Sequence, residues 1–331
     1  MTNTVSEAAH IKIIQLIAKE LGVGPPQVAA AVLLLDEGST VPFIARYRKE
    51  ATDNLDDTQL RNLEERLLYL RELEERRAAI LASIEEQGKL TGELSAAIEA
   101  AATKQTLEDI YLPYKPKRRT RAQIAREAGL EPLADALFAD PTLDPEQEAA
   151  KYVNGRPAAD NGVPDAKAAL EGARDILAER FAETAELLAS LRRRMWEQGI
   201  VTSNVLKGKE SAEEEKFRDY YDYSETIRTI PSHRALALFR GQSLGVLKIE
   251  LGLGEKIESV VDTVAAAAVP HPCAAMIAAH FGIEERGRRA DKWLADVCHW
   301  TWRVKTHPHI STELLAQLRE AAEAEAIKIF G

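Results

Sequence analysis

Apolar residues recur mainly every three or four positions along this chain, which is the spacing of one face of an α-helix. The first predicted helix covers residues 7–21, and the Gly-Pro-Pro run at 24–26 ends it. Its expected apolar face consists of Ile11, Ile14, Ile17 and Leu21. A second helix is expected near 25–37, since prolines are tolerated in a first helical turn.

The next predicted helix is long. Asp56 and Gln59 have the spacing of an N-cap and its reciprocal partner. Apolar residues at helical spacing then continue to about Gln87, which gives a strut of roughly 45–50 Å at 1.5 Å per residue. A second strut is expected beyond residue 166, ending at Gly199. Its apolar side would carry Leu170, Ala173, Leu177, Phe181, Leu188, Leu191 and Met195.

Shorter helices and a little strand complete the pattern. The helices are expected near 92–102, 105–111, 120–128, 131–139, 271–281, 288–305 and 311–329. Alternation of apolar and polar residues predicts a strand at 245–252, and 200–205 is a weaker candidate. The predicted fold class is therefore mainly α, elongated and multi-helical, with two strut helices and one small β element near 200–252. A polar stretch with Pro and Gly at 153–166 separates two expected domains, residues 1–155 and 165–331.

Composition narrows the class of protein. The chain has 331 residues, a formal net charge of −10, and 29% charged against 45% hydrophobic residues, as in soluble globular proteins. Its N-terminus has no basic region followed by an apolar run, so we expect no signal peptide. Apolar runs are shorter than the ~20 residues that span a bilayer, so we expect no membrane association. With only Cys273 and Cys298, the chain fits a reducing cytoplasm.

Catalytic and cofactor motifs are not found in the sequence. The Gly-rich stretch at 252–257 has Ile257 where a third glycine would bind phosphate. The histidines and cysteines of the C-terminal part are scattered over several predicted elements, without the spacing of a zinc site. We therefore expect no catalytic residue, no metal and no cofactor, and a protein that is not an enzyme.

One short segment opposes the negative charge of the chain. The stretch LPYKPKRRTRAQIAREAGL, residues 112–130, holds six cations and no carboxylate between its first and last cation. These candidate nucleic-acid-binding residues are Lys115, Lys117, Arg118, Arg119, Arg121 and Arg126. Pro113 and Pro116 favour a loop, and Thr120 can cap a following helix whose N-terminus adds positive potential. Contact with a phosphate backbone is one interpretation; acidic partners, inside this chain or on another protein, and a merely solvated loop are the others.

Two secondary candidates combine cations with aromatic residues. Trp293, Val297, Trp300 and Val304 have helical spacing, which predicts a core stripe. Trp302 lies off that stripe beside Arg303 and Lys305, so stacking on a base or a protein partner is the alternative to core packing. In the stretch FIARYRKE, Arg46 and Arg48 flank Tyr47, where a structural role competes with binding.

Three long strings carry a resemblance to a known family. They are STVPFIARYRKEATDNLDDTQLRNLEERLLYLRELEERR, TLEDIYLPYKPKRRTRAQIAREAGLEPLAD and PSHRALALFRG. The chain resembles the bacterial Tex family of transcription accessory proteins, which is related to the core of a eukaryotic transcription elongation factor. The similarity runs from about Ile11 to the C-terminus.

The resemblance implies a helical N-terminal half with a helix-turn-helix-like element. An RNase-H-like domain, usually without evident nuclease activity, then helix-hairpin-helix modules and a C-terminal OB-fold would follow it. The OB-fold carries most nucleic-acid binding in the family. The last residues of this chain would lead into the RNase-H-like domain, so binding of RNA or DNA by this chain alone is expected to be weak.

The resulting hypothesis is a non-enzymatic, nucleic-acid-associated scaffold from the N-terminal part of a transcription accessory protein. It would contribute a basic surface and orient C-terminal nucleic-acid-binding modules. The alternative is a protein-interaction module that docks to RNA polymerase or to ribosome-associated factors without touching nucleic acid.

Overall fold

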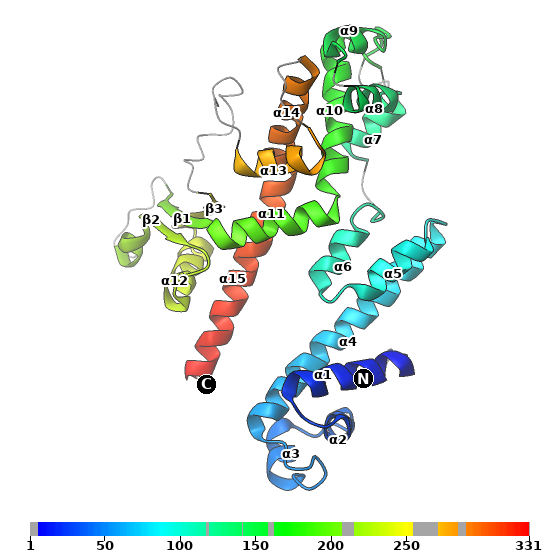
Figure 1. Ribbon diagram of the computed structural model, residues 1–331. Coiled ribbons are helices and arrows are strands. Elements are labelled where there is room, and N and C mark those ends of the chain that lie inside the picture. The colour runs from blue at the N-terminus through cyan, green and yellow to red at the C-terminus, as the bar shows by residue number, and fades with distance from the viewer. Residues whose placement is uncertain are drawn as a thin grey trace. The chain divides into compact units, whose positions relative to one another are not determined.

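Helices dominate the computed structural model, which describes residues 6–116, 119–140, 142–157, 162–206, 215–253, 271–283 and 289–330. Within these residues the chain forms fifteen α-helices and one three-stranded sheet (Figure 1), which confirms the mainly α fold class with a small β element. Packing divides the chain into two units, residues 1–115 and 116–331. This packing boundary precedes the expected one at 153–166, because the helices between the two positions pack within the second unit.

The first unit is built around the long helix α4, Asp57–Glu86. Figure 1 shows α1, α2 and α3 gathered around its first half and α5 and α6 along its second half. These helices are α1 (Glu7–Leu21), α2 (Pro25–Asp36), α3 (Val41–Tyr47), α5 (Gly92–Ala100) and α6 (Lys104–Tyr111).

The start and the buried stripe of α4 agree with the sequence pattern. The Gln59 backbone N–H donates to Asp56 Oδ1 at 2.7 Å, and the Asp56 N–H donates to Gln59 Oε1 at 3.0 Å. The helix has 30 residues, a length of about 45 Å. Its buried apolar residues are Leu60, Leu63, Leu67, Leu70, Leu73, Ile80 and Ile84. The expected face of α1 differs at one position, since Ile11 is 50% exposed while Ile13 is buried.

The second unit contains a helical bundle around α10, Ala166–Ala182, against which α7, α8, α9 and α14 pack. The remaining helices are α7 (Arg121–Glu127), α8 (Glu131–Ala139), α9 (Pro145–Ala150), α11 (Ala185–Gln198), α12 (Ser232–Ser243), α13 (Pro272–His280), α14 (Arg289–Trp300) and α15 (His307–Phe330). The segment expected as one continuous second strut is interrupted at Thr184, whose ψ of 107° leaves the helical region. Apolar spacing did not reveal this break, because Phe181 and Leu188 keep a seven-residue interval across it.

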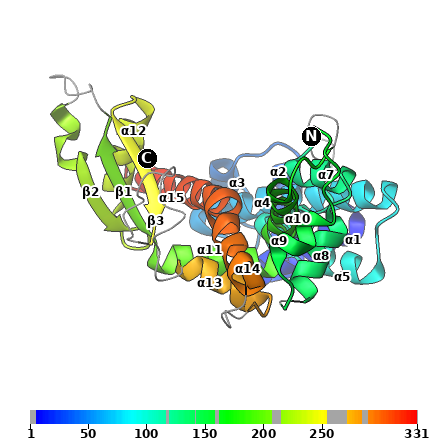
Figure 2. The same ribbon diagram turned by 90° about the horizontal axis from the view of Figure 1, so that it is seen from above.

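The small sheet is antiparallel throughout, in the order β2-β1-β3 (Figure 2). Its strands are β1 (Ile200–Val205), β2 (Asp222–Thr226) and β3 (Leu247–Gly252). The two expected strands are confirmed, and β2 is an addition. Helix α12 packs against β3, where Leu247 and Leu251 are buried.

A π-helical turn, Thr301–Thr306, joins α14 to α15 in one continuous helical run. The Thr306 hydroxyl donates to the carbonyls of Thr301 at 3.2 Å and Trp302 at 3.3 Å. Such a turn places an extra residue in the helix and rotates all later residues about the helix axis. Within this turn Trp302 is 2% exposed and Val304 is 48% exposed, so Val304 departs from the expected core stripe, whereas Val297 is buried as expected.

None of the helices in the described part of the chain combines the length and the apolarity needed to cross a membrane.

Candidate nucleic-acid interface

The basic segment begins at a tight turn and ends in a short helix. After α6 the backbone N–H groups of Tyr114 and Lys115 both donate to the Tyr111 carbonyl, at 2.9 and 3.0 Å. The Thr120 hydroxyl then accepts from the Gln123 N–H at 3.1 Å and caps α7, as predicted. Arg121 is therefore the first residue of a helix, at its positive end.

The six predicted cations fall into three groups. Lys115 is exposed and is the last residue of the first unit. Lys117 and Arg118 lie outside the described residues. Arg119, Arg121 and Arg126 belong to the second unit. The basic segment thus spans the boundary between the two units.

Two of the three candidate arginines that belong to the second unit pair with carboxylates of the same unit. Arg119 Nε donates to Glu127 Oε2 at 3.1 Å, although more than half of the Arg119 side chain is exposed. Arg126 Nη1 donates to Glu179 Oε2 at 2.7 Å, and Arg126 Nε to Glu131 Oε1 at 3.3 Å. Burial lowers the pKa of Arg126, but Glu179 and Glu131 outweigh burial and raise the pKa above its ordinary value. Arg126 is thus engaged inside the protein and joins α7 to α10.

Arg121 differs from these two arginines. Its side chain is exposed, and it makes no ion pair within 4 Å with any carboxylate among the described residues. The positive charge of Arg121 nevertheless interacts electrostatically with the buried Asp175 on α10. Burial raises the pKa of Asp175, while the charges of Arg174, Lys305 and Arg121 act in the opposite direction and offset part of that rise.

The fold thereby brings Arg121, a primary candidate, and Lys305, a secondary candidate, close to the same carboxylate, Asp175. Lys305, in the π-helical turn, lies near Asp175 together with Arg174, and both cations also face the Trp300 ring. The Arg174 guanidinium carbon is 4.4 Å and Lys305 Nζ is 5.9 Å from the ring centroid. Sequence reasoning missed this grouping, because Arg121, Arg174 and Lys305 are far apart along the chain.

Burial overturns the stacking role considered for Trp302. Its Nε1 donates to His271 Nε2 at 3.2 Å, and its ring meets the rings of His271 and His307. At 2% exposure this indole offers its face neither to a base nor to a partner. Neighbouring Arg303 remains exposed.

In the first unit Arg46 and Arg48 are exposed, as is Tyr47 between them. The Arg48 guanidinium carbon lies 5.9 Å from the centroid of the Phe43 ring. The Phe43 and Tyr47 rings are 5.4 Å apart.

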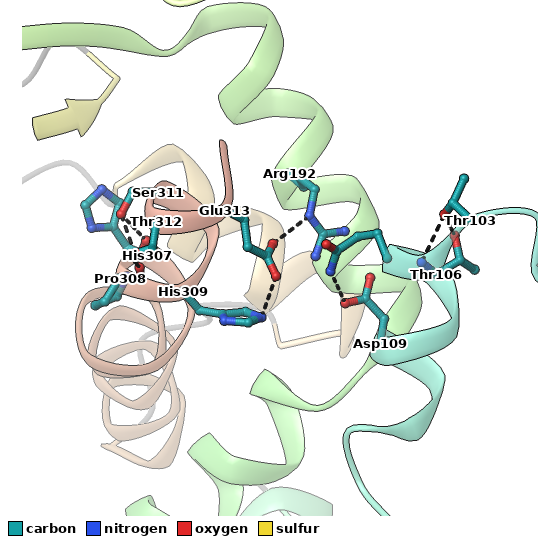
Figure 3. A network of polar contacts seen from close by, with 11 residues as sticks. Thr103, Thr106, Asp109, Arg192, His307, Pro308, His309, Ser311, Thr312 and Glu313 are labelled. Carbon is teal, nitrogen blue, oxygen red and sulfur yellow. Dashed lines mark hydrogen bonds and ion pairs between the residues drawn. The ribbon is translucent and has the colours of Figure 1, made fainter. Parts of the chain in front are cut away.

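A network of ion pairs joins α11 to α15 (Figure 3). Glu313 lies between Arg192 and His309, with Arg192 Nε at 3.0 Å from one carboxylate oxygen and His309 Nε2 at 2.9 Å from the other. Burial raises the pKa of Glu313, but the hydrogen bond with His309 and the positive charge of Arg192 prevail and lower it. The network therefore stabilises packing within the second unit.

The described residues include two cysteines and several other side chains of the kinds that can bind a metal. No group of three or more His, Cys, Asp or Glu side chains that could hold a metal occurs among the residues the structure describes. Cys273 and Cys298 are both buried free thiols. Burial raises the pKa of Cys298 to about 12, which keeps that thiol protonated and unreactive.

Comparison with known proteins identifies two matching family models. The one described as Tex central region-like matches residues 140–330, and the one described as Tex-like protein N-terminal domain matches residues 11–85. "Protein tex" of Bordetella pertussis is 55% identical over 99% of this chain and 41% of its own length. "Transcriptional accessory protein Tex" of Neisseria gonorrhoeae is 50% identical over 97% of this chain and 40% of its own length.

A more distant relative is human "S1 RNA-binding domain-containing protein 1", 27% identical over 96% of this chain and 31% of its own length. The chain thus spans about two fifths of the length of these bacterial relatives and about one third of the human one.

Proposed function

This chain belongs to the Tex family, and from that premise we propose that it is the helical scaffold of a transcription-associated, nucleic-acid-related protein. The printed names of its relatives, one a transcriptional accessory protein and another an S1 RNA-binding domain protein, support this role. The chain acts without catalysis, in the cytoplasm. It orients nucleic-acid-binding modules that follow it in the whole protein, and it adds a basic surface of its own.

A rigid helix suits this role. The α4 helix, about 45 Å long, is capped at its start and packed along its length, so it fixes the distance between the elements at its two ends. Rigid elements position binding groups more accurately than loops do.

One observation carries the nucleic-acid contact: Lys115 and Arg121 are exposed in a chain of net charge −10, and neither forms an ion pair with a described carboxylate. Together with Lys117 and Arg118, they are the four cations that we assign to phosphate binding. Arg119 contributes less, because it is paired with Glu127, and Arg126 serves the fold.

The salt dependence of binding tests this assignment. Each phosphate neutralised on duplex DNA adds about −0.9 to the slope of log K against log[salt], so four contacts give about −3.6. Changing Lys115, Lys117, Arg118 and Arg121 to alanine should bring the slope close to zero.

A matched control removes the same charge elsewhere. Lys12, Lys19, Arg61 and Lys89 are all exposed, and their replacement by alanine should leave the slope within about one contact of the wild-type value. If both variants lose binding equally, net charge alone governs binding and the assigned surface is wrong. If wild-type protein binds no duplex or single strand at low salt, direct nucleic-acid contact is refuted.

A second candidate function is docking to RNA polymerase or another transcription protein without nucleic-acid contact. Several large apolar side chains of the first unit are exposed: Ile11, Leu16, Leu33, Phe43, Tyr47 and Leu68. Exposed apolar groups of this kind are typical of protein interfaces when they gather in one patch. Stable capture of purified RNA polymerase by a chain that binds no nucleic acid at low salt would favour this function.

A further inference from the structure

The end of α3 presents two aromatic rings and three cations to solvent. We define the α3 patch as Phe43, Arg46, Tyr47, Arg48 and Lys49, all of which are exposed. Tyr47 is 70% and Phe43 41% exposed, although burial of such rings is worth more than that of most side chains. Their outward position therefore requires an explanation.

The fold holds the α3 patch in a fixed shape. Val41 and Ile44 anchor the other face of α3 in the core. Behind the patch the fully buried Thr52 donates its hydroxyl to the carbonyls of Arg48 and Lys49, at 3.4 and 3.3 Å. These bonds fix the backbone that carries the cations.

A side chain from α2 fixes the loop beyond the patch. Gln27 Nε2 donates to the Asp53 carbonyl at 2.8 Å, where Asp53 and Asn54 adopt the left-handed conformation with φ of 48° and 65°. The loop is thus tied to two helices, and binding at the α3 patch costs little conformational entropy.

The arginines of the first unit separate into two classes. Five of the seven lie on α4, and each pairs with a carboxylate: Arg61 with Asp57, Arg66 with Glu20, Arg71 with Asp36, Arg76 with Glu108 and Arg77 with Glu74. The other two, Arg46 and Arg48, form no ion pair with any described residue, and neither does Lys49. The carboxylates of Glu50 and Asp53 are close in sequence but leave these cations unpaired. Arg46 and Arg48 are thus the exception in a unit whose other arginines are all paired, and arginines without acidic partners are suited to an anion from outside.

We propose that the α3 patch binds single-stranded nucleic acid, with Tyr47 stacking on a base and Arg46, Arg48 and Lys49 contacting the phosphates on either side. This inference rests on the proposed nucleic-acid-related function and adds a second site and its ligand class. Exposed aromatic rings between cations are the combination that binds single strands, because an unpaired base offers its π face and the backbone its charge. In a duplex the bases are already stacked, so Tyr47 would gain nothing there.

The probes are labelled oligo(dT), labelled oligo(U) and a labelled duplex, measured by fluorescence polarisation at several salt concentrations. Tyr47→Ala should weaken single-strand binding about 5- to 150-fold, the range for loss of one stacked base, while Tyr47→Phe retains wild-type affinity. The double variant Arg46→Ala/Arg48→Ala should lessen the slope of log K against log[salt] by about 1.4, at about 0.7 per phosphate on single strands. The oligo(dT) and oligo(U) arms show whether DNA or RNA is preferred.

Lys12→Ala/Arg61→Ala is the charge-matched control and should change neither affinity nor slope. Because all the altered side chains are exposed, each variant should melt at the wild-type temperature. Equal single-strand affinity of wild type and Tyr47→Ala overturns the proposal. Loss of RNA polymerase capture by Tyr47→Ala with oligonucleotide binding unchanged also overturns it, in favour of a protein partner.

The two proposals fail in different ways. If the variant of Lys115, Lys117, Arg118 and Arg121 loses duplex binding while the α3 variants bind single strands as wild type does, the α3 patch is refuted and the basic segment stands. If the α3 variants lose single-strand binding while the variant of Lys115, Lys117, Arg118 and Arg121 binds duplex as wild type does, the α3 patch stands and the basic segment is refuted. Absence of all nucleic-acid binding at low salt refutes both.

Discussion

The pairing of Arg126 leads to a prediction that separates a structural cation from a binding cation. Arg126→Ala removes one ion-pair partner of Glu179, whose side chain is only 10% exposed, and one of the half-exposed Glu131. Loss of a cation beside a largely buried carboxylate is costly, because water replaces little of the lost interaction there. We therefore expect this substitution to act on stability first.

The magnitude depends on the burial of the pair. Breaking a fully buried pair costs about 3–5 kcal/mol, whereas an exposed pair contributes less than about 1 kcal/mol. Arg126 is 34% exposed, and solvent screens part of its interaction, so the expected loss lies between these limits, at about 1–3 kcal/mol. For a unit of this size that corresponds to a fall in Tm of roughly 3–9 °C.

Urea unfolding of Arg126→Ala, Glu179→Ala and the double variant provides the measurement. The double variant should be less destabilised than the sum of the two single variants, because each single change already removes the pair. Arg121→Ala is the matched control on the same helix: it should change the urea midpoint much less than Arg126→Ala does, but reduce the salt slope for duplex DNA by about 0.9. If Arg126→Ala keeps wild-type stability and loses as much of the slope as Arg121→Ala, the division between the two arginines is refuted.

Three further outcomes are expected. Glu313→Gln should lower the free energy of unfolding by about 1–2 kcal/mol at neutral pH. Because the pKa of Glu313 is lowered in the folded protein, this difference from wild type should disappear as the pH falls below the ordinary value of 4.5, which unfolding measured at several pH values would show. Gly241→Ala should destabilise the protein by about 1–3 kcal/mol, although alanine has the better helix propensity. The new Cβ would lie 2.5 Å from Cδ1 of the buried Leu247, and a lower urea midpoint would report the loss. At pH 8 the Cys298 thiol should be ionised in about one molecule in ten thousand, so a disulfide reagent should modify it only as fast as the protein unfolds.

Much of the helical framework was predictable from local chemistry. The Asp56–Gln59 capping box, the apolar stripe of α4 and the Thr120 cap of α7 depend on residues at most a few turns apart, which a sequence displays directly. The same holds for β1 and β3, whose residues alternate in burial.

Features set by distant contacts were not predictable. The strand β2, DYSET, has no strong apolar alternation and forms because β1 offers it a hydrogen-bonding edge. The break at Thr184 leaves the seven-residue spacing of the apolar residues on either side unchanged, so apolar periodicity does not reveal it. The role of Arg126 depends on Glu179, 53 residues away, and only the fold brings these two side chains together. The exposure of Tyr47 likewise depends on the way α3 meets its neighbours.

The π-helical turn has a consequence for how the second unit tolerates change. It sets the angle between the apolar faces of α14, directed at α10 and α13, and of α15, directed at α11 and α12. Deleting one residue from Thr301–Thr306 would restore an ordinary helix and swing the whole of α15 by about 100°. The number of residues in this turn therefore determines the rotational orientation of α15 about its axis. Substitutions in the turn can preserve that orientation, but deletion of one residue cannot.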